Sequence, residues 1–592
     1  MKNILFYILT AIIFLAPYKY VEQDNMNGML FGIIAAFFIC VLQSLKLNKR
    51  YGILLVIMVI TSILSLTLTS LTVESLQGLS LYLSTFLLYF IFVEFKAKEE
   101  ELLKIITYVM AVNSVVYIII QGAFYNGGIL EGRIDGNVGY ANTYALIMLI
   151  ALYFNNIREK DSLKGILDLL FIQSILFTGS RNTLLYLGIF ALVDIGNKKV
   201  KTGKISLLMI FNCILGEFIY FLISKLRLGG VLIVPIILIV YFFYIEEKNR
   251  RIINLLTLIA VPVGILGVFF MESNLASRIA EASLNSNELQ LRFGYLEDVI
   301  SYVLKNPLGG GLNTYMYNQG AFQTGFYDIR YVHNSFGQAL YDMGFVGLIA
   351  FTALFIGGLL TIIKGDNKNK FLYLFLYLTI YMHSILDFDF AYLVIFTVIS
   401  MIAAFSGEID INFENKILSL KVIAGFLGLY VFSTTTVYYI ANKELSNGYY
   451  TRAIKEAEVL SKITIEDNSS RLLIFDGMKS LYYDTGNIEY LKSAAKLLEE
   501  SEGRNRKSYV YSKLAFAYEE LGDIDKSSEY YEKNLDIQKH TKYIYDSYCN
   551  MLTRAEELNG IDYSNKKDEI MNRYYTIEAE RSEKSKKRFG QY

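Results

Sequence analysis

The sequence has few of the residues that build disulfide-bonded or nucleic-acid-binding proteins. Only three cysteines occur among 592 residues, Cys40, Cys213 and Cys549, and the first two lie inside apolar runs. This spacing supports neither a disulfide framework nor a thiolate metal site. Lys and Arg together number 56, as do Asp and Glu, and no basic patch stands out. Nucleic-acid binding is therefore not expected.

Charged residues are also scarce, at 19% of the chain against 54% hydrophobic residues. A soluble multidomain protein of this length is less apolar, so the apolar excess must face lipid. The long apolar runs fall in residues 1–440, whereas residues 441–592 are rich in Lys, Glu, Ser and Tyr. We predict an all-α fold: a polytopic transmembrane helix bundle over 1–440, followed by a second domain over 441–592.

Apolar segments long enough to cross a membrane recur along the first domain. A hydrocarbon core of roughly 30 Å needs about 20 apolar residues per helix, and no barrel-type alternation is present. We expect about 12–15 spans, the first of them retained rather than cleaved as a signal peptide. The candidate segments are 4–21, 28–45, 52–71, 76–95, 104–122, 138–154, 163–179, 182–196, 205–223, 229–245, 252–271, 338–363, 370–386, 389–406 and 417–440.

The orientation follows from basic residues, because short loops rich in Lys and Arg stay cytoplasmic. Every second loop is basic, so Met1 is predicted to be cytoplasmic. The loops near 123–137, 178–182, 272–337 and 383–389 are then predicted to be outside. If the span at 417–440 is real, the second domain is outside too. The basic loops contain Lys46, Lys49 and Arg50; Lys96, Lys98 and Lys104; Arg158, Lys160 and Lys164; Lys198, Lys199, Lys201 and Lys204; Lys248, Arg250 and Arg251; Lys364, Lys368 and Lys370.

Glycines recur at Gly448, Gly486, Gly522 and Gly560, spaced by 38, 36 and 38 residues. A period in the middle thirties is typical of helix-turn-helix repeats. The segment from residue 509 to 533 looks like a tetratricopeptide repeat. An isolated helical hairpin is the alternative, but the recurrence favours stacked repeats, which usually bind peptides or partner proteins.

The segment 272–337 is the only extensive polar stretch of the first domain, and long connections of this kind tend to be functional. Its end contains His333-Asn334, nine residues, Gly344, two residues and Gly347. This pattern resembles the signature of the O-antigen ligase and polymerase superfamily, which includes bacterial protein O-oligosaccharyltransferases. Further segments that look like this family are Arg292 before Asn306-Pro-Leu-Gly, Thr178-Gly-Ser-Arg-Asn182 and Gly136-Asn-Val-Gly-Tyr-Ala-Asn142.

The resemblance implies transfer of glycan from an undecaprenyl-pyrophosphate donor to an acceptor hydroxyl, without a nucleotide sugar, a metal or another cofactor. An acceptor hydroxyl needs a general base, and imidazole is the usual choice. His333, one of three histidines, is the candidate, and Asn334 is expected to bind substrate beside it. The alternative is an exposed loop histidine that only bonds its neighbours.

The departing pyrophosphate needs positive charge, which guanidinium groups supply bidentately. Arg181 and Arg292 are the catalytic candidates, and Arg133 is a candidate for substrate binding. Arg181 could instead snorkel to the interface, Arg292 could be a helix-surface charge, and Arg133 could pair with Glu131 and Asp135.

His383 and Asp387 lie one helical turn apart near an expected external boundary. They are predicted to line the cavity or orient the acceptor, because too few partners accompany them for a metal site. The run Gly309-Gly310-Gly311 could offer amides to phosphate, but a tight turn after Pro307 is preferred.

Several functional interpretations remain open. The acceptor is a glycan, a lipid or a protein, so ligase, polymerase and protein O-oligosaccharyltransferase remain alternatives. A lipid-linked glycan flippase or transporter is the rival from another class, but no duplicated halves are seen and only four prolines occur. A non-catalytic membrane anchor would leave the polar segment and its histidine unexplained.

Overall fold

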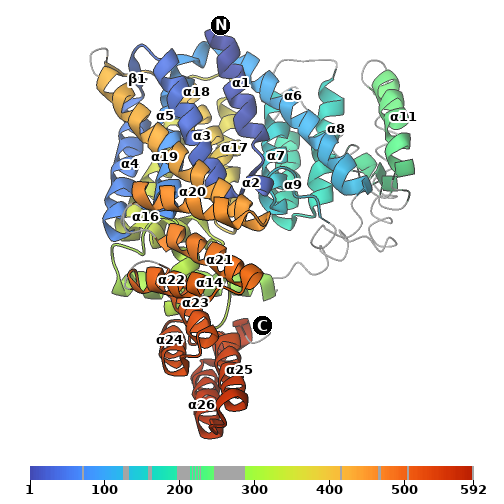
Figure 1. Ribbon diagram of the computed structural model, residues 1–592. Helices are drawn as coiled ribbons and strands as arrows, with labels where there is room; N and C mark the ends of the chain where they lie inside the picture. Colours follow the sequence, from blue (N-terminus) through green and yellow to red (C-terminus); the bar gives the residue numbers. More distant parts are fainter. Residues whose placement is uncertain are drawn as a thin grey trace.

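The structure is a computed structural model, and it describes residues 1–69, 72–124, 133–157, 163–196, 228–245, 287–413, 417–464, 468–502 and 506–589, with isolated positions between 212 and 226. These residues are almost entirely helical, and the strands among them form one two-stranded ribbon. The expected all-α class is therefore confirmed. Figure 1 shows a helix bundle with a narrower stack of helices at one end.

The bundle is built from long apolar helices and short connecting turns. Its elements are α1 (Lys2–Leu15), α2 (Tyr18–Val21), α3 (Gln23–Val41), α4 (Lys49–Thr69), α5 (Val73–Glu94), α6 (Glu99–Tyr117), α7 (Ala141–Ile157), α8 (Lys164–Thr178), α9 (Arg181–Gly196), α11 (Leu228–Ile245), α16 (Ser335–Lys364), α17 (Lys370–Ser384), α18 (Leu393–Ser406) and α19 (Ile417–Ser446), with short helical turns η1 (Lys96–Lys98), η2 (Ile118–Phe124) and η5 (Asp389–Ala391).

These helices coincide with the expected spans, apart from 205–223 and 252–271, which lie mostly or wholly outside the described residues. By length and composition, six of the described helices can cross a membrane: the regions of α3, α4, α5, α6, α16 and α19. Helices α1, α7 and α18 are apolar but shorter. The helical positions were thus predictable, whereas the expected 12–15 crossings are not all supported by length.

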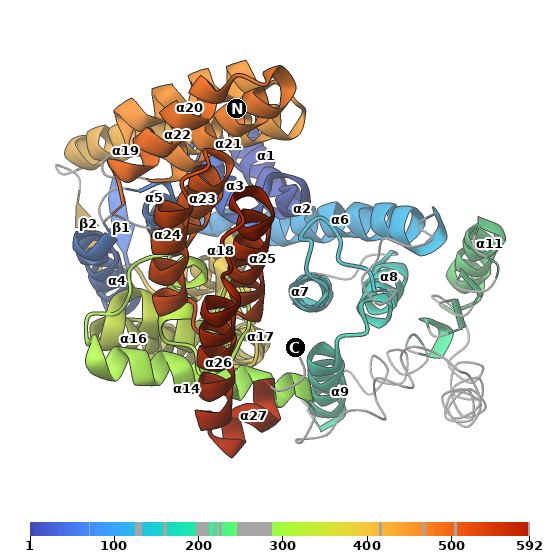
Figure 2. The ribbon, with the colours of Figure 1, turned by 60° about the horizontal axis from the view of Figure 1, so that its bottom comes forward.

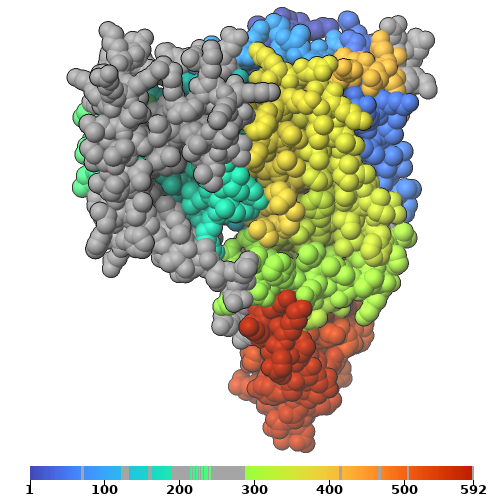
Figure 3. Space-filling view, turned by 180° about the vertical axis from the view of Figure 1, so that it is seen from behind, coloured from blue at the N-terminus to red at the C-terminus, as the bar shows by residue number. Residues whose placement is uncertain are grey.

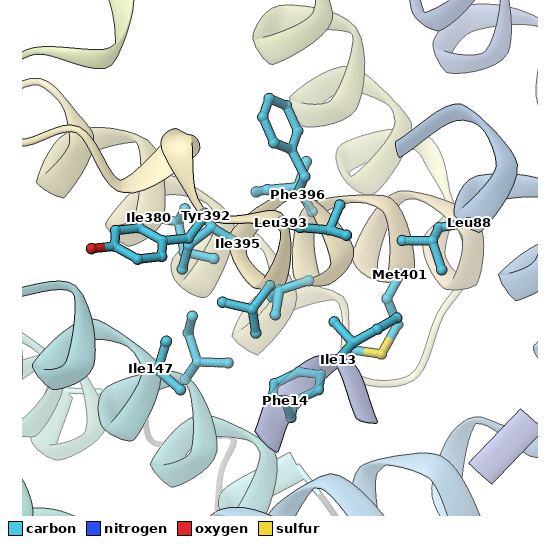
Figure 4. Close-up of a cluster of buried hydrophobic side chains, with 14 of the residues drawn as sticks. Ile13, Phe14, Leu88, Ile147, Ile380, Tyr392, Leu393, Ile395, Phe396 and Met401 are labelled. Atoms are coloured by element: carbon cyan, nitrogen blue, oxygen red, sulfur yellow. The ribbon is translucent and has the colours of Figure 1, made fainter. Parts of the chain in front are cut away.

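The centre of the bundle is formed by α5 and α18, which are buried on nearly every face. A helix that is apolar all round belongs in the interior of a bundle. Figure 4 shows Leu393, Ile395 and Phe396 of α18 among Phe14 of α1 and Ile147 of α7. Helix α19, in contrast, exposes apolar side chains on its outer face, where Phe426 is 73% exposed. Apolar residues in such positions fit a lipid environment.

The basic segments of the sequence meet at one end of this bundle. Lys46 contacts Glu94 at 3.3 Å, and the Lys96 ammonium donates to the Gly407 carbonyl at 2.6 Å. At the same end, β1 (Leu45–Leu47) pairs antiparallel with β2 (Ile411–Phe413). Helices α16 and α18 finish here, so the residues that precede them lie at the opposite end.

The polar segment expected as a loop over 272–337 lies at that opposite end, and its described part begins at residue 287. It contains α14 (Asn287–Lys305), α15 (Tyr315–Asn318) and the turn η4 (Gln319–Ala321). Helix α14 is amphipathic, and its buried face includes Leu291, Tyr295 and Val299. A long unstructured connection would leave many backbone groups to water. Instead, α14 lies across the end of the bundle (Figure 1).

The second domain is a run of antiparallel helices that projects beyond α14, as Figure 3 shows. The glycine turns expected from the sequence are present, because Gly448, Gly486, Gly522 and Gly560 all have positive φ. The tetratricopeptide assignment stays a prediction. His540 is 7% exposed and contacts Glu578. The helices are α20 (Tyr450–Ile463), α21 (Asn468–Thr485), α22 (Ile488–Glu499), α23 (Lys507–Glu520), α24 (Ile524–Ile537), α25 (Lys542–Asn559), α26 (Ser564–Glu580) and α27 (Glu583–Phe589).

The last helix, α27, returns to the membrane domain and docks on α14 (Figure 2). Phe589, 2% exposed, packs against Tyr295 and Tyr327 at ring-centroid distances of 6.1 and 5.2 Å. Gly294 leaves the space for this ring, since a Cβ there would lie 2.5 Å from it. Arg588 forms an ion pair with Glu297 of α14. The two domains are therefore joined at both ends of the second domain.

A second contact ties the domains together near the start of α23. Arg506 is buried, forms an ion pair with Glu74 of α5 and donates to the Tyr317 hydroxyl at 2.8 Å. Ser469 donates to the same Glu74 carboxylate at 2.7 Å. A guanidinium and a carboxylate buried together stabilise one relative placement of the two domains, because separating them would leave both without a partner.

We predict that Phe589→Ala frees α27 from α14. Removing a buried phenyl ring costs about 3–5 kcal/mol. This loss is larger than the stabilisation that the ion pairs between α27 and α14 provide. Hydrogen exchange should then speed up in residues 287–305 and 583–589. Tyr575→Ala is the control, because Tyr575 is 57% exposed. Unchanged exchange in Phe589→Ala would show that the docking does not depend on this ring.

Candidate functional site

The loop between α17 and α18 is fixed by three side chains that donate to three consecutive carbonyls. Asn334 donates to Ile385 at 2.8 Å, and Ser335 donates to Asp387 at 3.0 Å. Arg292 donates to the Leu386 carbonyl between them. Backbone carbonyls buried away from water need such partners. The start of α16 and the middle of α14 thus set the position of this loop.

Asp387, at the centre of the loop, gathers polar groups from three other parts of the chain. Its side chain is 1% exposed and accepts hydrogen bonds from the Tyr140 hydroxyl and the Asn142 amide, both at 2.9 Å. The Arg292 guanidinium lies 3.5 Å from Oδ2, and His333 Nδ1 lies 3.6 Å from Oδ1. A buried carboxylate is stable only when paired and hydrogen-bonded, and this one is both.

The charges around Asp387 fix its protonation state. Burial raises the pKa of this carboxyl, but the opposing charge of Arg292 and the contact with His333 outweigh burial and hold the pKa well below its usual value. Burial also lowers the pKa of Arg292, whereas Asp387, Tyr140 and Glu288 raise it further, so the guanidinium stays charged. Asp387 and Arg292 therefore remain a charged pair over the whole physiological pH range.

His333 lies against aromatic rings and faces Asp387 with one nitrogen. Its ring is edge-on to Phe388 at 5.0 Å and lies 5.9 Å from Tyr295 of α14. Nδ1 is buried and has no hydrogen-bond partner among the described residues, since Asp387 is just beyond hydrogen-bond range. Catalytic hydrogen bonds are often long before substrate binds. The arrangement directs Nδ1 at a carboxylate and leaves Nε2 for another group.

Two of the arginines share one acidic partner. Glu288 accepts from Arg292 Nη2 at 2.8 Å and from Arg181 Nη2 at 2.5 Å. The Glu288 side chain is 48% exposed, whereas those of Arg292 and Arg181 are 13% and 24% exposed. Two guanidinium groups thus converge on an accessible carboxylate. A free anion with several oxygens could occupy the same position.

Arg133 is linked to the same centre through Asn142. Its Nη2 donates to Asn142 Oδ1 and its Nε to the Thr178 carbonyl, both at 2.5 Å. Asn142 in turn donates to Asp387. The pairing considered for Arg133 in the sequence involved Glu131, which lies outside the described residues, and Asp135, which forms an ion pair with Lys19 at 2.8 Å.

His383 belongs to a neighbouring pair rather than to Asp387. Its Nδ1 lies 2.7 Å from Asp389 Oδ2, and its Nε2 lies 3.2 Å from the Thr183 hydroxyl. Both His383 and Asp389 are fully buried. Thr183 is on the first turn of α9, two residues after Arg181. This contact therefore places the start of α9 against α17, and the role expected for His383 stays a prediction.

All the residues named from the sequence as site candidates meet at this end of the bundle, although their roles stay predictions. Sequence reasoning did not single out Glu288 or Tyr140, whereas Asp389 was considered together with His383 and Asp387. A carboxylate four residues before Arg292 on one helix was a usable signal for Glu288. Asn142 was noticed only as the end of a motif. Among the described residues, no three His, Cys, Asp or Glu side chains are arranged to hold a metal ion.

One of the signature glycines of α16, Gly344, is required for a steric reason. Gly344 has φ of +66°, and a Cβ there would lie 2.1 Å from the Pro307 carbonyl oxygen. The run after Pro307 is a turn packed on this kink, since Gly309 N donates to Asn306 and Gly310 N to Tyr341. The turn interpretation is confirmed: these two amides bond backbone carbonyls. Asn334 starts the same helix by accepting from Gly337 N at 2.8 Å.

The fold and this site define a helical membrane protein with a buried His–Asp–Arg centre at one end of its bundle. Residues 166–352 match the family model described as O-antigen ligase. This match covers about a third of the chain and supports its resemblance to the O-antigen ligase superfamily, that is, to membrane glycan transferases of ligase or polymerase type. The matched range contains Arg181, Arg292, His333 and Asn334. No curated protein matches the chain.

We predict that Gly344→Ala destabilises the kink in α16 by more than about 2 kcal/mol, because a methyl group would clash with backbone atoms and the residue must keep a positive φ. The melting temperature in detergent should fall. Gly188→Ala on α9 is the matched control, since no atom lies within 4 Å of a Cβ there. Equal melting temperatures for the two variants would contradict this account.

Proposed function

We propose that this protein transfers glycan from a polyprenyl-pyrophosphate-linked donor to an acceptor hydroxyl, as a polysaccharide ligase or polymerase. The observation that carries the proposal is Asp387, which holds an imidazole and a guanidinium side by side at one end of a membrane bundle. Glycosyl transfer from a pyrophosphate requires a base for the acceptor and positive charge for the leaving group. The site offers both within one cluster.

His333 acts as the general base. With Nδ1–H directed at Asp387, Nε2 carries a lone pair that can take the proton of the acceptor hydroxyl. The acceptor oxygen then attacks the anomeric carbon of the donor sugar, and the bond from that carbon to the phosphate oxygen breaks. Asp387 stabilises the imidazolium that forms, in the way a buried carboxylate supports a catalytic histidine.

Arg292 and Arg181 bind the pyrophosphate that leaves with its polyprenyl chain. Charge develops on the phosphate oxygens as the bond breaks, and fixed guanidinium groups stabilise it without reorganisation. In the structure, both arginines pair with Glu288, whose side chain is more exposed than theirs. Glu288 therefore holds the place of the donor anion and swings towards solvent when the pyrophosphate arrives. Arg133, through Asn142, supports the opposite side of Asp387.

The active site is assigned to the extracytoplasmic face. The segments rich in Lys and Arg lie at the other end of the bundle, and such segments stay in the cytoplasm. Helix α14 and the second domain lie at the same end as the site (Figure 1). The second domain is then outside as well, where an acceptor glycan, lipid or protein partner is present.

Transfer should depend on His333 and Arg292. In nanodiscs with a polyprenyl-pyrophosphate-linked glycan, His333→Ala and Arg292→Lys should each lower kcat/KM by about 100-fold or more, because one loses the base and the other the planar guanidinium. His540→Ala and Arg573→Lys are matched controls in the second domain and should transfer normally. Undiminished transfer by His333→Ala would remove the catalytic assignment.

The orientation is tested by cysteine labelling in a variant whose three native cysteines are replaced. A cysteine at Leu308, which is 63% exposed beside the site, should react with an impermeant maleimide added to intact cells. A cysteine at Lys368, whose side chain is 68% exposed at the other end, should react only after the cells are opened. The reverse pattern would place the site in the cytoplasm.

A further inference from the structure

A second polar region adjoins the site inside the bundle. It is a cavity of about 40 Å³ between α3, α5, α16 and the segment that contains α15. Carboxylate, amide and aromatic side chains share its lining, and none of them belongs to the His–Asp–Arg centre. The side chains that matter here are Asp24, Gln77, Asn313, Gln338, Asp342 and Phe388.

Asp342 lacks the partners that a buried carboxylate needs. It is 6% exposed, and its Oδ1 accepts from Gln338 Nε2 at 2.9 Å and from Asn313 N at 3.3 Å. Within the described part of the chain, Oδ2 accepts no hydrogen bond, and no Lys, Arg or His forms an ion pair with Asp342. Burying a carboxylate in this way is costly unless something donates to it. Asp342 lines the cavity.

The opposite wall is already satisfied. Asp24 accepts from Arg330 Nη2 at 2.7 Å and from the Tyr331 hydroxyl at 2.6 Å. Asp24 therefore needs no further partner, and the lining also offers the hydrogen-bonding groups of Asp342 and Gln338. A ligand with several hydroxyl groups can donate to such groups and accept from them.

The cavity is close to the catalytic base. Phe388 lines it with one face, and the same ring lies 5.0 Å from the His333 ring and 5.2 Å from the Tyr331 ring. Ser335, two residues after His333, lines it as well. On its other side, a smaller cavity shares Asp24 and extends to Arg506 at the second domain. The two cavities thus form a polar tract that runs from the second domain to Phe388, and the Phe388 ring separates this tract from His333.

We propose that this cavity is an acceptor subsite that holds the hydroxyl-rich edge of the sugar next to the one that reacts. A volume of about 40 Å³ accommodates about three water molecules, which suits the hydroxyl groups along a ring edge rather than a whole ring. Sugar hydroxyls bond to the Asp342 carboxyl group and accept from Gln338, while Phe388 offers an apolar face to the ring. The inference rests on the proposed transferase function.

Binding is measured separately from transfer. The chain has no tryptophan, so Tyr82→Trp, in the cavity wall, places a single fluorescent reporter in the purified full-length protein. Titration with N-acetylglucosamine oligosaccharides should change its emission. Adding Asp342→Asn should weaken the oligosaccharide binding at least about tenfold, because the amide cannot reproduce the hydrogen bonds that the carboxyl group makes with the sugar. No emission change with any saccharide would overturn the proposal.

In the transfer assay, Asp342→Asn should raise the KM of the acceptor at least about tenfold and leave the KM of the donor unchanged. The melting temperature should not fall, because Asn fills the same volume and keeps an oxygen that accepts from Gln338 and from Asn313 N. Asp168→Asn is the matched control: Asp168 is also buried, and it accepts from Asn155 at 2.7 Å near the basic segments. A lower melting temperature, or an equal rise in both KM values, would mean a structural role and refute the subsite. Saccharide binding without transfer would sink the proposed function alone.

Discussion

The organisation of this membrane domain depends on one buried carboxylate, Asp387, and on the charges that keep it ionised. A carboxylate away from water must be paired with a cation and hydrogen-bonded, or it takes up a proton. Arg292 supplies the cation, and Tyr140, Asn142 and His333 complete the surroundings. Because these groups come from α14, the start of α7 and the start of α16, satisfying one side chain brings distant parts of the chain together.

The loop that carries Asp387 contains two carboxylates, and each of them contacts a different histidine. In Asp387-Phe388-Asp389, the first carboxylate faces His333 and the second pairs with His383, while the ring between them packs on His333. The pair with His383 also contacts Thr183 at the start of α9, which carries Arg181. One short loop thus positions both the proposed base and, more indirectly, one of the proposed pyrophosphate ligands.

The second domain is integrated into the catalytic unit. It contacts α5 through Arg506 and α14 through Phe589 and Arg588, and α14 bears Arg292 and Glu288. A stack of helices that only captured a partner would need no such buried ion pair with the membrane domain. Helix α14 therefore links the second domain to Arg292, one of the proposed pyrophosphate ligands.

The sequence by itself determined the helical class, the positions of most helices and the residues gathered at the site, because hydrophobic runs of membrane length and the Gly, Asn and His positions of the signature are local features. It predicted the turn after Pro307 but not the helix α14, whose amphipathic pattern lies within a polar stretch. Only the tertiary structure decided which carboxylate serves which histidine, that Glu288 bridges two arginines, and that Asp342 is left without a cation. These pairings depend on how helices far apart in the chain pack, and the free energy of a buried charge depends on every group around it.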